Sequence, residues 1–191
     1  MTEADRPFSP DAETRIGDAL AAAHSALCLT RRELEAAGEE PERWRWVALG
    51  LVSALQAALI AALSGYDTAR LEDIANPSQP ERAAPVALLL RRARSSEHLE
   101  PPERLALSAA AVRRLDTLIA LRNAAVHGLG FRPPSAPLDL VRTGAGVIRH
   151  LLLDAPAFKP DRYGSYLSRI GQELTAIDRI CQPDDPGLTS K

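Results

Sequence analysis

Apolar residues recur at the spacing that places them on one face of an α-helix along most of the chain. No stretch shows the strict apolar–polar alternation of a half-buried β-strand. Ser9-Pro10 supplies a helix N-cap followed by proline at the first helical position. Glycines mark three of the predicted helix ends: Gly38, Gly65 and Gly128. The pattern predicts helices over residues 10–37, 41–65, 81–99, 102–127, 138–153 and 162–181.

The connections between these helices are short and rich in glycine and proline. Residues 66–80 are predicted to be a loop with one helical turn at 69–74, and residues 130–137 a proline-rich connection. The ends of the chain, residues 1–8 and 182–191, are predicted to be flexible tails. Because short loops make consecutive helices antiparallel neighbours, we expect a single all-α domain over residues 1–191. Its architecture is an up-and-down bundle of four to five long helices with short extra helices.

The second predicted helix has an uncharged stretch, residues 46–66, that is long enough to span a bilayer. Ser53, Gln56 and Ser64 interrupt it, and the rest of the chain is amphipathic. We therefore expect a central helix buried on most sides, or one with a face in the core and another in a dimer interface, and no membrane span. The first fifteen residues are polar and acidic and do not resemble a signal peptide, so a cytoplasmic protein is expected.

Composition narrows the possible functions. Of the 191 residues, 46% are apolar but only 4% are aromatic, so alanine and aliphatic side chains must fill the core. The net charge of −2 excludes a bulk polyanion binder, and any contact with nucleic acid would need a local basic patch. Cys28 and Cys181 are interpreted as two reduced core thiols.

Common cofactor and metal motifs are absent from the sequence. There is no glycine-rich phosphate loop, no Cys-x-x-Cys pair and no His-Glu-x-x-His pattern. Gly144-Ala145-Gly146 falls within a predicted helix and is interpreted as a close contact between helices. Histidines occur at four positions that do not match metal-ligand spacing: His24, His98, His127 and His150. We expect neither a cofactor nor a metal.

Two charged clusters have a structural and a functional interpretation. Acidic residues near the end of the first helix are expected to form a solvated face: Glu33, Glu35, Glu39 and Glu40. Arg91, Arg92 and Arg94 follow three leucines in the third predicted helix. They are candidates for contacting RNA, or they are a solvated group of cations near a helix C-terminus, where the helix dipole favours positive charge.

The remaining candidate site is the end of the helix predicted over residues 102–127. Asn123 and His127 are four residues apart and share a helix face. Arg122 precedes His127 by five residues, which places it about 140° around an ideal helix, flanking the pair. A guanidinium can hold negative charge that develops on a phosphate, and an imidazole can transfer a proton near neutral pH. An ordinary helix ending explains the same residues if Arg122 pairs with a carboxylate such as Asp116 and Gly128 caps the helix.

The Arg122-Asn123 pair with His127 on an all-helical chain resembles the HEPN superfamily. These small helical bundles carry an arginine, often followed by asparagine, one to two helical turns before a histidine. The resemblance implies a metal-independent endoribonuclease of a toxin–antitoxin or defence system. In such enzymes two motifs meet across a homodimer cleft and cut RNA, leaving a 2′,3′-cyclic phosphate. It implies catalytic roles for Arg122, Asn123 and His127, with RNA and an antitoxin or other protein as partners.

One position departs from the family pattern. Some HEPN toxins carry a tyrosine two residues after the histidine, which a partner nucleotidyltransferase modifies, and Leu129 occupies that position here. Neutralisation by that route is therefore not supported. Two alternatives remain open: a non-catalytic HEPN-like module that binds a nucleotide, RNA or protein, and an unrelated helical adaptor or regulator.

Overall fold

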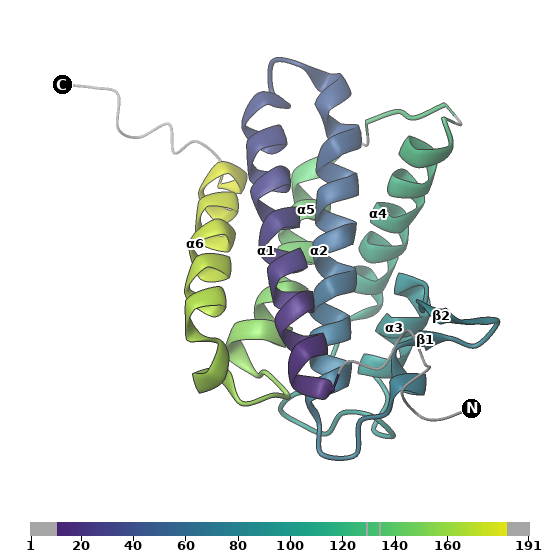
Figure 1. Ribbon diagram of the computed structural model, residues 1–191. Coiled ribbons are helices and arrows are strands. Elements are labelled where there is room, and N and C mark those ends of the chain that lie inside the picture. The colour runs from purple at the N-terminus through teal and green to yellow at the C-terminus, as the bar shows by residue number, and fades with distance from the viewer. Residues whose placement is uncertain (1–10, 129, 134, 183–191) are drawn as a thin grey trace.

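The computed structural model describes residues 11–128, 130–133 and 135–182. This part of the chain folds into a helical bundle with one small sheet, which confirms the predicted all-α class (Figure 1). The helices are α1 (Ala12–Ala36), α2 (Trp44–Gly65), α3 (Val86–Ala93), α4 (Ala109–His127), α5 (Pro137–Arg149) and α6 (Gly164–Cys181). The antiparallel strands are β1 (Ala75–Asn76) and β2 (Gln79–Ala83). Short helical turns are η2 (Pro41–Arg43), η3 (Leu71–Asp73), η4 (His150–Asp154) and η5 (Pro160–Tyr163).

The long helices α1, α2, α4, α5 and α6 run alternately up and down the bundle (Figure 1). One buried apolar cluster includes side chains from all six helices, so the described residues share a core. The predicted N-cap at Ser9-Pro10 lies outside the described residues. Within them, Asp11 caps α1, because its Oδ1 accepts a hydrogen bond from the Thr14 backbone N–H at 2.8 Å.

The helix α2 lies at the centre of the bundle and packs against α1, α3, α4 and α5. The segment Pro41–Gly65 is long and apolar enough to cross a membrane, but its most apolar 18-residue window, with a mean hydropathy of 2.1, is 78% buried inside the bundle. The environment is that of a core helix, as the sequence predicted. Burial differs along the helix: Leu55 in its middle is fully buried, whereas Trp46 near its beginning is 47% exposed.

The two longest helices approach closely where Gly50 of α2 faces Thr30 and Ala26 of α1. A Cβ atom at Gly50 would lie 2.6 Å from Thr30 Oγ1 and 3.0 Å from the Ala26 carbonyl oxygen. The Thr30 hydroxyl donates to that same carbonyl at 2.8 Å, which fixes its rotamer. Glycine at this position therefore sets the distance between α1 and α2. The predicted contact at Gly144 of α5 is also present, since a Cβ there would lie 3.0 Å from the Leu51 side chain.

The prediction of a helix over residues 81–99 is wrong at both of its boundaries. Residues 75–83 form the β1–β2 hairpin, and the helix in this region is the eight-residue α3, Val86–Ala93. Pro80 and Pro85 prevent an earlier start, because proline disfavours helical backbone in the residue before it. The hairpin turn is held by the Asn76 side chain, whose Oδ1 accepts from the Ser78 N–H at 3.0 Å.

The predicted start of the fourth helix at Pro102 is also wrong. Helix α4 begins at Ala109, where the Ser108 Oγ accepts a hydrogen bond from the Ala111 N–H at 3.2 Å. The residues before it form an irregular segment in which Leu105 is buried and donates its N–H to the Ala93 carbonyl at 3.0 Å. Leu105 therefore contributes to the core from a loop. The other helix boundaries agree with the prediction to within a few residues once the short turns beside α2, α5 and α6 are included.

Candidate functional site

Arg122, Asn123 and His127 lie in the last turns of α4. Arg122 is half-buried, whereas Asn123 and His127 are exposed. Gly128 ends the helix with a φ of 66°, a left-handed conformation that favours glycine, so the predicted C-terminal glycine is confirmed. Because α4 buries only Leu115 and Leu118 fully, it is an edge helix with one side turned outward. The three side chains are therefore presented on the surface of the bundle.

The polar groups of this motif have no partner in the described part of the chain. Among residues 11–128, 130–133 and 135–182, no hydrogen bond or ion pair engages the side chains of Arg122, Asn123 or His127. The interpretation as an ordinary helix ending expects Arg122 to pair with a carboxylate such as Asp116, and no such ion pair forms among the described residues. The guanidinium, amide and imidazole therefore remain available to a ligand.

The motif lies on an open surface. Cavities of about 220 to about 590 Å³ lie elsewhere in the described residues, for example between α1 and the β1–β2 hairpin and beside η5. Two large apolar side chains are exposed at this end of the bundle, Val126 (54%) on α4 and Trp46 (47%) on α2. The C-terminal end of α4 and the N-terminal end of α2 share that end (Figure 1).

The three arginines at the end of α3 differ in exposure and in partners. Arg91 and Arg94 are exposed, but Arg92 is half-buried and donates hydrogen bonds to two backbone carbonyls, those of Asp73 at 2.9 Å and Ala75 at 3.2 Å. Arg92 thereby joins α3 to the η3 turn and the hairpin. Helix α3 lies near the start of α4, at the opposite end of that helix from His127 (Figure 1).

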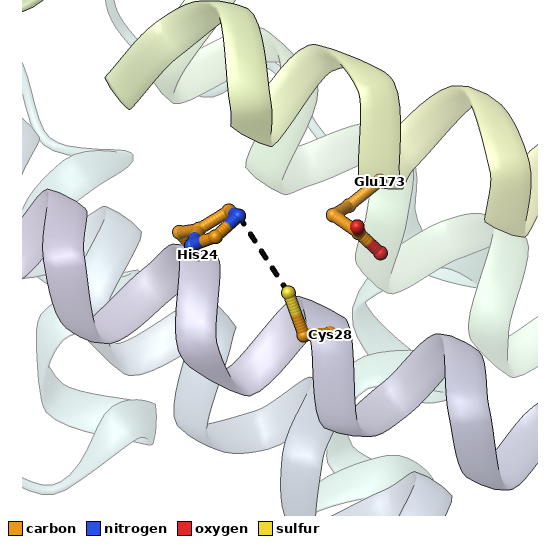
Figure 2. A group of neighbouring side chains, drawn as sticks. All are labelled: His24, Cys28 and Glu173. Carbon is orange, nitrogen blue, oxygen red and sulfur yellow. Dashed lines mark hydrogen bonds between the residues drawn. The ribbon is translucent and has the colours of Figure 1, made fainter. Parts of the chain in front are cut away.

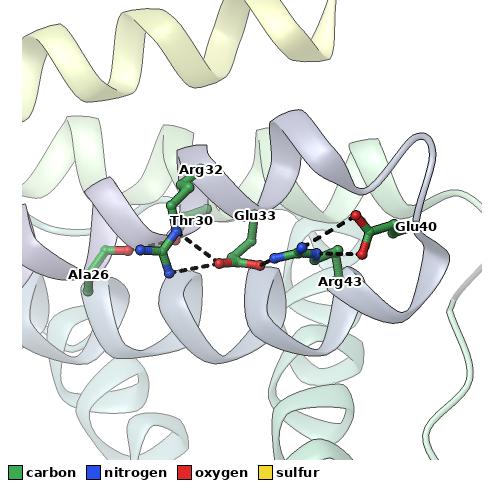
Figure 3. A network of polar contacts seen from close by, with 6 residues as sticks. All are labelled: Ala26, Thr30, Arg32, Glu33, Glu40 and Arg43. Carbon is green, nitrogen blue, oxygen red and sulfur yellow. Dashed lines mark hydrogen bonds and ion pairs between the residues drawn. The ribbon is translucent and has the colours of Figure 1, made fainter.

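The acidic cluster at the end of α1 is not uniformly solvated, so that prediction is wrong for Glu33. The Glu33 side chain is 4% exposed and pairs with Arg32 at 2.8 Å and with Arg43 at 3.0 Å (Figure 3). Arg43 also pairs with Glu40 at 3.0 Å. The hydrogen bond from Arg43 lowers the pKa of Glu33, and burial opposes this shift. The network ties the end of α1 to the beginning of α2.

A second group of chemically active side chains lies between α1 and α6, and the sequence interpretation missed it. His24 and Cys28 are four residues apart on α1, and Glu173 of α6 faces them (Figure 2). One ligand atom from each residue lies within 4.8 Å of the other two, and His24 Nε2 is 3.6 Å from Cys28 Sγ. Both cysteines are free thiols; Cys28 is half-buried and Cys181 is buried. Burial, followed by the neighbouring carboxylate of Glu173, raises the pKa of Cys28.

The Glu173 carboxylate is held in place by Arg31. The Arg31 Nε donates to Glu173 Oε2 at 2.7 Å, and its other arm donates to Glu35 Oε1 at 2.8 Å. The only signal in the sequence was the four-residue spacing of His24 and Cys28, because 142 residues separate Arg31 from Glu173.

No family model matches the chain, and neither a curated protein nor a solved structure matches it.

Proposed function

We propose that the chain is a HEPN-like, metal-independent endoribonuclease that acts as a homodimer. The observation that carries this proposal is the group at the end of α4. Arg122, Asn123 and His127 lie there on an outward surface, with no hydrogen bond or ion pair among the described residues.

The three groups supply what cleavage of RNA at a 2′-hydroxyl requires. The 2′-oxygen forms a bond to phosphorus, the bond from phosphorus to the 5′-oxygen breaks, and the products are a 2′,3′-cyclic phosphate and a 5′-hydroxyl. His127 accepts the proton of the 2′-hydroxyl, and the His127 of a second copy supplies the proton to the 5′-oxygen. Arg122 stabilises the negative charge on the phosphorane, and Asn123 orients His127 one turn away.

A second copy would enclose a motif whose Asn123 and His127 side chains are exposed in the single chain. If two chains meet around a twofold axis near the end of α4, their motifs line one groove and Val126 and Trp46 become covered. Exposed apolar side chains next to polar ones are typical of contact surfaces. The same groove would hold the phosphodiester of an RNA strand between two arginines. A role as a toxin or defence factor with a protein partner belongs to the same proposal.

An RNA cleavage assay in EDTA, with the product ends analysed, tests this proposal. Wild-type protein should cleave and leave cyclic phosphate ends, and both Arg122→Ala and His127→Ala should lower the rate by at least about a hundredfold. Arg114→Ala is the matched control, because Arg114 is an exposed arginine earlier on α4 and should leave the rate unchanged. His127→Lys places an ammonium at the helix C-terminus, where the helix dipole favours positive charge, and removes the imidazole, so it should fold normally and fail to cleave.

Equal cleavage by wild type and His127→Ala would refute the assignment of the site. RNA binding that depends on Arg122 and His127, without turnover on any substrate, would instead identify the non-catalytic binding module.

A further inference from the structure

The seam between α1 and α6 brings together an imidazole, a thiol and a carboxylate from His24, Cys28 and Glu173 (Figure 2). We propose that these three side chains bind a zinc-class divalent cation, with water as the fourth ligand. This site is separate from the motif on α4, since α1 and α6 lie on the other side of α2 from α4 (Figure 1). The proposal is independent of the ribonuclease activity.

The spacing of the ligand atoms matches a tetrahedral ion. Zinc lies about 2.3 Å from a thiolate sulfur and about 2.0–2.1 Å from an imidazole nitrogen, which places sulfur and nitrogen about 3.6 Å apart at a tetrahedral angle. His24 Nε2 and Cys28 Sγ are separated by 3.6 Å. Their positions one helical turn apart on α1 therefore already hold two ligands at the distance that a shared ion requires.

The third ligand needs only a rotation of its side chain. A carboxylate oxygen on the same ion would lie about 3.3–3.7 Å from the other two ligand atoms, and the atoms now lie within 4.8 Å of one another. The Glu173 side chain can cover this difference of about 1 Å by changing its torsions. Arg31, which is also on α1, donates from Nε to Oε2 of that carboxylate at 2.7 Å, which leaves Oε1 for the ion. Hydrogen bonding to the distal oxygen of a ligating carboxylate is a common feature of metal sites.

The kinds of ligand select the kind of cation. Thiolate and imidazole favour zinc, cobalt or a similar ion over magnesium and calcium, which prefer oxygen ligands. On binding, the Cys28 S–H bond breaks, its proton leaves to solvent, and the sulfur electron pair forms the bond to the ion. His24 contributes its Nε2 lone pair. The cation then lies between the thiolate and the Glu173 carboxylate, which offsets their mutual repulsion and links α6 to α1.

Cobalt provides a direct test, because a thiolate bound to Co²⁺ gives a charge-transfer band in the near ultraviolet. Reduced, chelator-treated full-length protein should develop this band, saturate at one equivalent of Co²⁺ and lose the band when Zn²⁺ is added. Cys181→Ser is the matched control, because it removes the other cysteine, and it should retain the band. Cys28→Ser should abolish the band, and Glu173→Gln should weaken Co²⁺ affinity by at least about tenfold.

Zinc should also raise the melting temperature of wild type and of Cys181→Ser but not that of Cys28→Ser, since an ion that binds only the folded chain stabilises it. Circular dichroism checks that Cys28→Ser is folded. No band in wild type with a several-fold excess of Co²⁺ would overturn the proposal, as would a full band in Cys28→Ser. Unchanged Co²⁺ affinity in Glu173→Gln would overturn the three-ligand site.

Discussion

Replacing Gly50 with alanine tests the close packing of α1 against α2, which organises the whole bundle. The new methyl group would lie 2.6 Å from Thr30 Oγ1, 3.0 Å from the Ala26 carbonyl oxygen and 3.1 Å from the Thr30 nitrogen. Two of these atoms belong to the backbone, and the hydroxyl is fixed by its own hydrogen bond to Ala26. None can move without moving α1, so the helices must separate.

The magnitude follows from two opposing effects. Overpacking a tight interior costs about 1–3 kcal/mol, and the backbone contacts at Gly50 favour the upper end of that range. Alanine has a higher helix propensity than glycine, which stabilises the helix by about 0.8–1.0 kcal/mol. We therefore expect Gly50→Ala to lower the free energy of unfolding by about 2 kcal/mol.

Gly17→Ala is the matched control. Gly17 lies within α1, and a Cβ there has no neighbour within 4 Å, so only the gain in propensity of about 1 kcal/mol remains. The two variants should therefore shift stability in opposite directions, with a difference of about 3 kcal/mol. For a domain of this size that corresponds to about 6–12 °C between their melting temperatures.

Urea denaturation followed by circular dichroism measures the free energy of unfolding of both variants. Similar m-values would show that each variant exposes the same surface on unfolding as wild type. A Gly50→Ala protein as stable as wild type would refute the reasoning, because it would mean that α1 and α2 separate at little cost. A destabilised Gly17→Ala would also contradict it, since no contact accounts for such a loss.

Three further predictions concern other parts of the bundle. Glu33→Gln should lower stability at pH 7 by about 1–2 kcal/mol, less than the ~3–5 kcal/mol of a fully buried broken pair, because Arg32 and Arg43 are 70% and 39% exposed. Arg43 lowers the folded-state pKa of Glu33, so the stability that the Glu33 carboxylate contributes is present above its unfolded pKa of about 4.3 and is lost as pH falls through the folded pKa. The urea midpoints of wild type and Glu33→Gln should therefore converge in acid. A difference between the midpoints that stays constant with pH would contradict the assignment. Ser108→Ala should remove the cap of α4 and cost about 1 kcal/mol, read as a lower melting temperature, whereas Ser53→Ala on an exposed site of α2 should change little. If the proposed homodimer forms around the end of α4, Trp46→Glu should shift the sedimenting mass from dimer to monomer without unfolding the chain, because Trp46 is 47% exposed. A variant that still sediments as a dimer would contradict a contact through Trp46.

The elements that the sequence predicted well are those with a strong local signal. Helix α2 follows from an uncharged run that ends at Gly65, and the end of α4 follows from His127-Gly128. The β1–β2 hairpin carries no such signal, because every residue of β2 is exposed and the strand has no alternating pattern to detect. The start of α4 differs from the prediction because Pro102 suits a first helical position, whereas the side chain that caps the helix is that of Ser108.

Side-chain partners were predictable only where they are close in the chain. The spacing of Asn123 and His127 places them on one face of α4, and they lie there. By contrast, the burial of Glu33 depends on Arg43 reaching back from the start of α2, after the chain has turned. Glu173 contacts α1 only because α6 returns along it at the end of the chain. Tertiary packing determines these partners, and the helical periodicity of the sequence does not predict them.

The apolar character of α2 has a consequence for how the protein is made. Pro41–Gly65 has the hydropathy of a membrane segment, so a growing chain that exposed it for long would risk insertion into a bilayer or aggregation. Helix α1, its most extensive packing partner, is synthesised before it. Synthesis proceeds at about 5–20 residues per second, whereas a helix forms in about a microsecond. As α2 leaves the ribosome, α1 is therefore already available to cover it, and the helix pair can protect its apolar surface before the remaining helices have been translated.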